Sequence, residues 1–155
     1  MYGLADLPMI SPKVQGSILD TNKTVILDVG GDPAGCKVLR RFEEAIKKRS
    51  YEMLLVVNTQ RPFTSNEIEI NEMKNNLESI SELKVTELVC NANLMEFTSI
   101  EIIQTAIKII KNVALENNLI FNKYLVLNDS DNIYPTEIEG IKKIVLEYFL
   151  KKPWE

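Results

Sequence analysis

The chain has 155 residues, 45% of them hydrophobic, and carries 18 Lys and Arg against 22 Asp and Glu, which gives a net charge of −4. This length predicts one domain with one core. The sequence has no basic block, which disfavours direct binding of nucleic acid. It also has no histidine, which excludes zinc chemistry and Ser-His catalysis. Charges interrupt the long apolar runs and no signal peptide is recognisable, so we expect no membrane contact and a cytoplasmic protein with both cysteines reduced.

The first 22 residues differ from the rest of the chain. Pro8, Pro12 and the small polar residues around Ser11 predict an extended arm, with room for one short helix, rather than a sheet strand. From residue 23 onward, short β-branched runs alternate with segments of helical period, which is typical of βαβ units around a mainly parallel sheet. We therefore expect an α/β domain over residues 23–155, with about five strands and flanking helices.

The first strand is expected at residues 24–29, where the sequence reads TVILDV. Two glycines end this run, and Asp32 followed by Pro33 predicts a helix N-cap with proline at the first helical position. Apolar residues at helical spacing then predict one helix that continues to Arg49. The three parts together form a strand-turn-helix unit.

Four further runs predict strands. They cover residues 53–57, 85–91, 123–127 and 143–148. The run at 53–57 is continuously apolar, so we expect a central strand that is covered on both faces.

Two Thr-x-x-Glu patterns predict capping boxes at the starts of two helices. Thr64 with Glu67 begins a helix that continues to about residue 81. Thr98 with Glu101 begins a longer helix that ends at two successive asparagines. The wide apolar face of the longer helix indicates that it is well buried.

Asp28 lies at the end of the predicted first strand and is followed by Gly30 and Gly31. Open α/β sheets bind ligands at the carboxyl ends of their strands. An aspartate at such a position holds Mg²⁺ in nucleotide hydrolases, often through water, and glycines let backbone amides approach a phosphate. The alternative interpretation is a tight turn into a helix, and this pattern alone favours neither.

A glycine pattern in the same loop approaches the phosphate-binding loop G-x-x-x-x-G-K-[ST], with Gly30, Gly35 and Lys37 as its candidates. The match fails by one position, because Cys36 stands where the lysine should be. Neighbouring aspartates would also repel a phosphate at this helix start. We therefore expect no phosphate-binding loop, and no self-sufficient nucleotide hydrolase.

Polar residues follow the second and third of the expected strands. If the strands are parallel, Asn91 and Asn93 lie at the same edge of the sheet as Asp28, and Arg61 lies there too. An asparagine amide can pair with N6 and N7 of adenine, and an arginine can contact a phosphate. Taken singly, each residue is explained better by a turn or by a surface ion pair.

Together, the runs at residues 25–32 and 88–91 resemble the MinD/ParA and nitrogenase-iron-protein class of P-loop ATPases. The resemblance implies an incomplete P-loop NTPase-like Rossmannoid fold with ATP and Mg²⁺ as cofactors. It implies that Asp28 is the Walker B residue that organises Mg²⁺ and that a following glycine belongs to the switch that senses the γ-phosphate. It also implies that Asn91 contacts the adenine base.

A closer likeness, to a bacterial ATP-binding subfamily, covers nearly the whole chain. It is carried by Ala-Asp-Leu-Pro at residues 5–8, by Arg-Pro-Phe-Thr at residues 61–64 and by a Pro-Trp pair near the end of the sequence. In that family a first strand and a lysine-bearing phosphate loop precede the first of these segments. The resemblance therefore implies the C-terminal part of such a protein, with a homodimer or another chain that completes the sheet as its partner.

A second interpretation is a non-enzymatic protein-interaction module, or a subunit with a degenerate nucleotide site. Without a phosphate loop, most charge-assisted contacts to the β- and γ-phosphates are missing, each worth about 1.5–3 kcal/mol. On either interpretation we expect this chain alone to show no ATPase activity.

Overall fold

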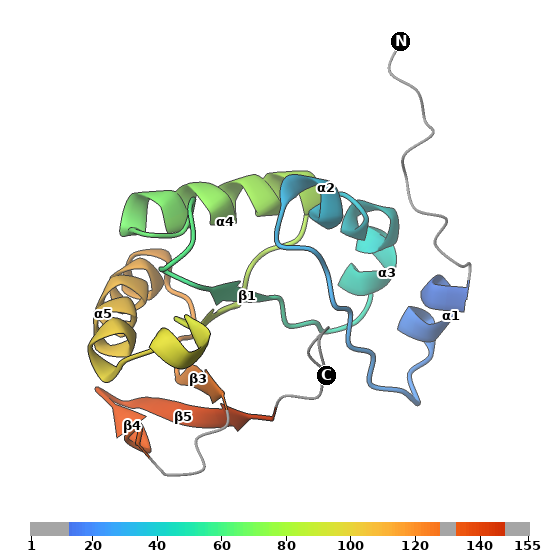
Figure 1. Ribbon diagram of the computed structural model, residues 1–155. Helices are drawn as coiled ribbons and strands as arrows, with labels where there is room; N and C mark the ends of the chain where they lie inside the picture. Colours follow the sequence, from blue (N-terminus) through green and yellow to red (C-terminus); the bar gives the residue numbers. More distant parts are fainter. Residues whose placement is uncertain (1–12, 128–132, 148–155) are drawn as a thin grey trace, which may run out of the picture. The chain divides into compact units, whose positions relative to one another are not determined.

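The computed structural model describes residues 13–127 and 133–147, which fall into two compact units (Figure 1). Of the described residues, the first unit contains 13–53 and Asn75–Lys84, and the second contains Leu54–Lys74, 85–127 and 133–147. Most of the expected extended arm, residues 1–12, lies outside the described residues.

A five-stranded sheet organises the second unit. Its strands are β1 (Leu54–Val57), β2 (Glu87–Cys90), β3 (Lys123–Leu127), β4 (Glu137–Ile138) and β5 (Ile141–Leu146). The spatial order is β1-β2-β3-β5-β4, and every neighbouring pair is parallel except β4 with β5. The expected α/β class with a mainly parallel sheet is therefore confirmed.

The prediction of a central strand at residues 53–57 is wrong for the described sheet, because β1 pairs only with β2 and lies at one end. The expected cover on both faces is wrong as well, because Leu54 and Val56 are 43% and 53% exposed. An apolar run indicates a strand but not how many neighbours it has or whether both of its faces are covered. β4, a strand that the sequence pattern did not reveal, is two residues long and lies at the other end.

Two long helices, α4 (Glu67–Ser81) and α5 (Ile100–Asn117), connect the first three strands. Both crossovers step in the same direction along the sheet, so the right-handed rule places both helices on one face. Hydrogen bonds join them, from Asn71 Nδ2 to Glu116 Oε2 at 3.0 Å and from Asn112 Nδ2 to Glu67 Oε1 at 2.6 Å. Figure 1 shows the two helices side by side.

The core of the second unit lies between these helices and the sheet. The strand register places Val57, Cys90 and Tyr124 in one row, and all three are buried. The apolar face of α5 is buried as well, through Ile103, Ala106, Ile107, Ile110, Val113 and Ala114. The expected burial of this helix is confirmed. None of the described helices is long and apolar enough to cross a lipid bilayer.

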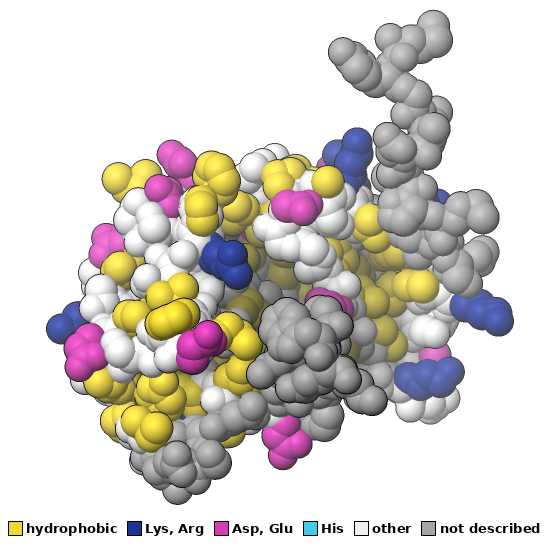
Figure 2. All heavy atoms as spheres, viewed as in Figure 1, with side chains coloured by type: hydrophobic (Ala, Val, Ile, Leu, Met, Phe, Trp, Pro, Cys, Tyr) yellow, Lys and Arg dark blue, Asp and Glu magenta, His cyan; other side chains and the backbone are white. Residues whose placement is uncertain are grey.

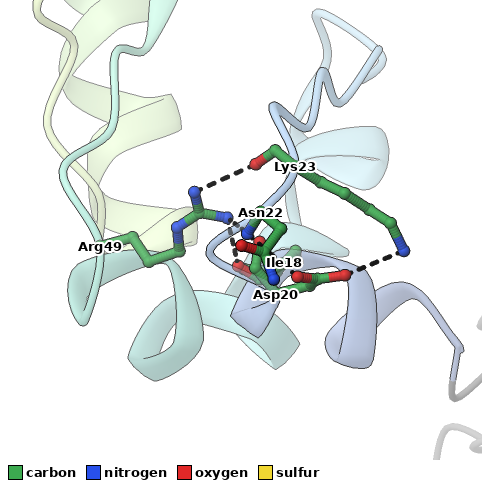
Figure 3. Close-up of polar contacts among 5 residues, drawn as sticks. All are labelled: Ile18, Asp20, Asn22, Lys23 and Arg49. Atoms are coloured by element: carbon green, nitrogen blue, oxygen red, sulfur yellow. Dashed lines mark hydrogen bonds and ion pairs between the residues drawn. The ribbon is translucent and has the colours of Figure 1, made fainter.

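Short helices form the first unit. They are α1 (Lys13–Leu19), α2 (Pro33–Cys36), the 3₁₀ helix η2 (Leu39–Phe42) and α3 (Glu43–Lys47). The guanidinium of Arg49 joins α1 and the following turn to the end of α3, because it donates hydrogen bonds to the carbonyl oxygens of Ile18, Asp20 and Lys23 (Figure 3).

The prediction of a strand at residues 24–29 is wrong. The segment forms no strand, and Ile26 is 90% exposed. A strand forms only where a neighbour satisfies its backbone N–H and C=O groups, and no described strand pairs with this segment. The segment has β-favouring side chains, but no strand within residues 13–127 and 133–147 pairs with it.

Asp32 and Pro33 are placed as expected. Asp32 caps α2 by accepting a hydrogen bond from Gly35 N at 2.6 Å, and Pro33 occupies the first helical position. The single helix expected to reach residue 49 is instead divided into α2, η2 and α3. Gly35 inside the first turn weakens helix formation there, which a count of apolar spacing does not include.

Both predicted capping boxes are shifted along the chain. The first turn of α4 is capped by Asn66, whose Oδ1 accepts from Glu69 N at 3.0 Å, while Glu69 Oε2 accepts from Ser65 N at 2.9 Å. Thr64, the predicted cap, instead donates its hydroxyl to the carbonyl oxygen of Asn58 at 2.8 Å. Successive residues at this helix start can all act as caps, so the pattern alone could not select one.

The start of α5 shows the same shift. Ser99, and not Thr98, is the N-cap and accepts from Ile102 N at 3.4 Å. The helix ends where predicted, because Asn118 adopts the left-handed conformation with φ of 54°.

Candidate functional site

The candidate site lies at the carboxyl edge of the parallel sheet in the second unit. The loops after β1 and β2 are tied together there, because Asn58 Nδ2 donates to Asn93 O at 3.0 Å and Asn91 N donates to Val57 O at 2.8 Å. Arg61, Asn91 and Asn93 therefore lie on two neighbouring loops at the edge where α/β sheets bind ligands.

Asn93 shapes its loop. Its Oδ1 accepts from Met95 N at 2.6 Å and from Thr98 Oγ1 at 3.2 Å, which holds Met95 at a positive φ of 56°. This network favours the turn interpretation for Asn93, since the oxygen that would face a base is already occupied.

Asn91 differs from Asn93, although both follow β2. Its side chain is half-buried and forms no hydrogen bond with another described residue. A half-buried amide without partners retains one acceptor and two donors for a ligand or for water. Asn91 is therefore the best-placed polar group at this edge.

The loop after β1 carries Arg61 and Phe63 on its surface. Arg61 is exposed, and its guanidinium forms no ion pair with any residue in the described ranges. Phe63 is 72% exposed and has a positive φ of 69°, a conformation that costs energy for a bulky residue. An exposed aromatic ring held in a strained turn is a candidate contact residue that the sequence reading did not single out.

Exposed apolar side chains also mark the loop after β2. Met95 and Phe97, in the 3₁₀ helix η3 (Met95–Phe97), are 51% and 74% exposed. Figure 2 shows hydrophobic side chains at the surface over this part of the second unit. The edge thus combines an amide and a guanidinium that have no partner in the described part of the chain with exposed aromatic rings.

A small cavity lies beside this edge. It has a volume of about 20 Å³, enough for one water molecule, and is lined by Asn93, Met95, Thr98, Leu125, Val126, Leu127 and Tyr134. The Tyr134 hydroxyl donates to Thr98 O at 3.1 Å and joins the two loops beside it. A nucleotide is far larger than this cavity, so a ligand at the edge would lie on the loop surfaces.

Asp28, Gly30 and Gly31 belong to the first unit, whereas the residues of the edge belong to the second. Asp28 is exposed, and a side chain at Gly31 would meet nothing within 4 Å. The close contact in this loop involves Gly35, since a Cβ there would lie 2.8 Å from the Cα of Gly30. This geometry supports the interpretation of a tight turn into a helix.

We expect Gly35→Ala to lower the unfolding free energy of the first unit by about 1–2 kcal/mol, because the added methyl group collides with backbone atoms that cannot move aside cheaply. Gly16→Ala is the matched control, since a Cβ there meets nothing within 4 Å and lies inside α1. It should stabilise by roughly 0.5–1 kcal/mol. Urea denaturation followed by circular dichroism measures both, and stabilisation by both variants would contradict the prediction.

Magnesium fits these residues only in part. The described residues contain no group of three Asp, Glu, Cys or His side chains that could hold a metal ion. Mg²⁺ is usually held by one or two carboxylates together with substrate phosphates. Asp28 can supply one such carboxylate, so the remaining ligands of Mg²⁺ would have to come from the phosphates of a bound nucleotide.

Neither cysteine is suited to covalent chemistry. Both are unpaired and buried, and burial raises the pKa of Cys90 to about 11 and also raises the pKa of Cys36. The nucleophilic form of cysteine is the thiolate, which is scarce at neutral pH when the pKa is raised. The two thiols therefore belong to the packing of the core.

No family model matches the chain, and neither a curated protein nor a solved structure matches it. The resemblance to the MinD/ParA class accordingly stays a prediction from the sequence. What the chain does has to be argued from the residues at the edge of the sheet.

Proposed function

We propose that this chain is the C-terminal, nucleotide-binding part of a MinD/ParA-like ATP-binding protein, and that the loops after β1 and β2 take the adenosine portion of ATP. The observation that carries the proposal is Asn91, a half-buried amide at the end of a parallel strand with no hydrogen-bond partner among the described residues. A polar group that is partly removed from water gains most from a ligand that pairs with it. Adenine presents a matching donor and acceptor at N6 and N7.

Two further features of the edge support this ligand. The guanidinium of Arg61, which is exposed and forms no ion pair with a described residue, is suited to a phosphate or ribose oxygen. The exposed rings of Phe63 and Phe97 offer faces on which a base can stack, an interaction worth about 1–3 kcal/mol per base. An amide, a cation and aromatic rings together suit a nucleotide better than an uncharged metabolite.

The proposed role is binding rather than hydrolysis by this chain alone. The chain has no lysine-bearing phosphate loop, so the charge that develops on a transferred phosphoryl group would lack its usual partners. Asp28 as a ligand of Mg²⁺ and Gly30 and Gly31 as contacts of a phosphate belong to the first unit and stay predictions from the sequence. No residue of the chain is proposed as catalytic, and the expected location is the cytoplasm.

Calorimetric titration with Mg-ATP tests the proposal. We expect weak, saturable binding that Asn91→Ala weakens roughly tenfold, because the variant loses both hydrogen bonds to the base. Asn76→Ala, a change at an exposed asparagine on α4, is the matched control and should leave binding unchanged.

Titration with adenosine alone separates the base from the phosphates, and Asn91→Ala should weaken this binding as well. Absence of heat at millimolar ATP, or equal affinities of wild type and Asn91→Ala, would contradict the proposal. In that case the exposed Phe63, Met95 and Phe97 favour the second function, a protein-interaction surface at the same edge.

A further inference from the structure

Two helices begin at the candidate edge of the second unit. α4 follows the loop after β1, and α5 follows the loop after β2. In α/β proteins such helix starts commonly hold the phosphates of a nucleotide, because their free N–H groups and the positive end of the helix dipole favour an anion. The groups that the chain itself places at these two starts therefore decide how the edge treats a phosphate.

The start of α4 already carries carboxylates. Glu69 Oε2 accepts hydrogen bonds from Ser65 N at 2.9 Å and from Ser65 Oγ at 2.8 Å, while Asn66 Oδ1 accepts from Glu69 N at 3.0 Å. The hydrogen bonds from Ser65 hold the pKa of Glu69 below its usual value, so this side chain is ionised at neutral pH. Glu67 adds a second carboxylate to the same turn. These negative charges take the place of an anionic ligand at the positive end of the helix dipole.

The start of α5 is closed in the same way. Ser99 caps the helix by accepting a hydrogen bond from Ile102 N at 3.4 Å, and Glu101 is an exposed carboxylate in the first turn. A hydrogen bond from Ser99 lowers the pKa of Glu101, so this side chain is ionised at neutral pH as well. Neither helix start is therefore free to attract a phosphate.

The charge of the whole edge is negative. Residues 58–70 and 91–103 contain the two loops and the first turns of both helices. They carry one guanidinium, that of Arg61, and four carboxylates, those of Glu67, Glu69, Glu96 and Glu101, which gives a net charge of −3. The groups that suit a base, the amide of Asn91 and the exposed aromatic rings, are uncharged. The edge thus offers contacts to a base but repels a polyphosphate.

We propose that this edge selects adenosine and its monophosphate over ATP, with the base and the ribose as the groups that supply the affinity. The inference rests on the proposed binding of adenosine at the edge and specifies which adenosine ligands bind best. Arg61 can offset one phosphate group, and the two loops contain no second cation for a polyphosphate. The further phosphates of ATP therefore lower its affinity unless Mg²⁺ neutralises them.

Calorimetric titration of the full chain with adenosine, AMP and ATP in the absence of Mg²⁺ tests the selectivity. We expect AMP to bind within about threefold of adenosine and ATP to bind roughly tenfold more weakly, because its charge meets the carboxylates at both helix starts. Added salt should strengthen the binding of ATP and leave that of adenosine unchanged, since salt screens repulsion between exposed charges.

Substitution of the two helix-start carboxylates tests their role. The double variant Glu69→Gln/Glu101→Gln should bind ATP roughly tenfold more tightly than wild type and adenosine equally well. Glutamine keeps a side-chain oxygen that can accept a hydrogen bond and is compatible with the first turn of a helix, so both helices should still form. Glu116→Gln is the matched control on α5. It removes the same charge about 22 Å along the helix from Glu101, well beyond the screening length of about 8 Å, and should change neither affinity.

The outcomes separate this inference from the proposed function. Absence of heat with adenosine at millimolar concentration would overturn both. Binding of adenosine together with equal or tighter binding of ATP would overturn the inference alone. An ATP affinity that falls with added salt, or one that the double variant leaves unchanged, would overturn it too. Equal gains in the double variant and in Glu116→Gln would show that the charges at the helix starts are not the cause.

Discussion

Replacement of Ile107 by alanine is expected to lower the unfolding free energy of the second unit by about 3 kcal/mol. Ile107 is fully buried on the apolar face of α5, with Ile103 and Ile110 one turn away on either side. The smaller side chain loses the transfer free energy of three carbon atoms and leaves a cavity that the packed sheet and helices cannot close. Urea denaturation followed by far-ultraviolet circular dichroism measures the change.

A matched variant on the same helix separates burial from helix propensity. Leu115 is 74% exposed, so Leu115→Ala should change the unfolding free energy by less than about 0.5 kcal/mol. Both variants introduce alanine into α5, and only one removes buried apolar surface. Similar losses in the two variants would show that the described face of α5 does not form the core.

The second large effect is expected from Arg49→Ala in the first unit. The guanidinium donates hydrogen bonds to Ile18 O at 2.8 Å, Asp20 O at 3.0 Å and Lys23 O at 3.1 Å (Figure 3). Such charge-assisted bonds are worth about 1.5–3 kcal/mol each when buried, and partial exposure reduces this value. We expect a total loss of about 2–3 kcal/mol, concentrated in α1 and the turn that follows it.

Hydrogen exchange measured by mass spectrometry locates this loss. Amides of α1 should exchange faster in Arg49→Ala, while those of α5 should be unchanged. Arg49→Lys should restore only part of the protection, because an ammonium group has one nitrogen and lacks the planar set of N–H donors with which the guanidinium reaches three carbonyl oxygens. Arg41→Ala is the control, since Arg41 is exposed and forms no ion pair with a described residue. Equal effects of Arg41→Ala and Arg49→Ala would contradict the role of Arg49.

Local sequence determined those elements whose physical cause lies within a few neighbouring residues. The residues of β1, β2 and β3 are apolar runs bounded by polar loops, and all three strands form within the predicted ranges. The turn from Asp32 to Pro33 was predicted because an N-cap and a fixed proline φ act within one helical turn. The end of α5 at Asn118 was predicted for the same reason.

Choices between neighbouring alternatives were not determined by local sequence. Asn66 and Ser99 cap α4 and α5 in place of Thr64 and Thr98, although all four side chains can accept from a helix N–H. The difference lies in other contacts, as Thr64 donates its hydroxyl to Asn58 across the loop. Such contacts depend on residues that are distant in sequence.

For the candidate site, the sequence identified the edge of the sheet but not which side chains there already have hydrogen-bond partners. Strand-end position alone gave Asn91 and Asn93 equal weight, and only the resemblance assigned the adenine base to Asn91. The fold occupies Asn93 Oδ1 with two hydrogen bonds and gives the side-chain amide of Asn91 no partner among the described residues. The sequence did not single out the strained turn at Phe63, because backbone strain follows from how a loop closes.

The sequence by itself determined the α/β class, the residues of β1, β2 and β3 and the loops that carry the candidate ligand-binding residues, because periodicity and turn chemistry act over a few residues. The last strand was expected at residues 143–148 and is found as β5, two residues earlier at Ile141–Leu146. Tertiary structure alone decided that β1 lies at an edge and that residues 24–29 form no strand. Those outcomes depend on whether a neighbouring strand satisfies the backbone hydrogen bonds. The sequence of a segment does not show which strand will lie beside it.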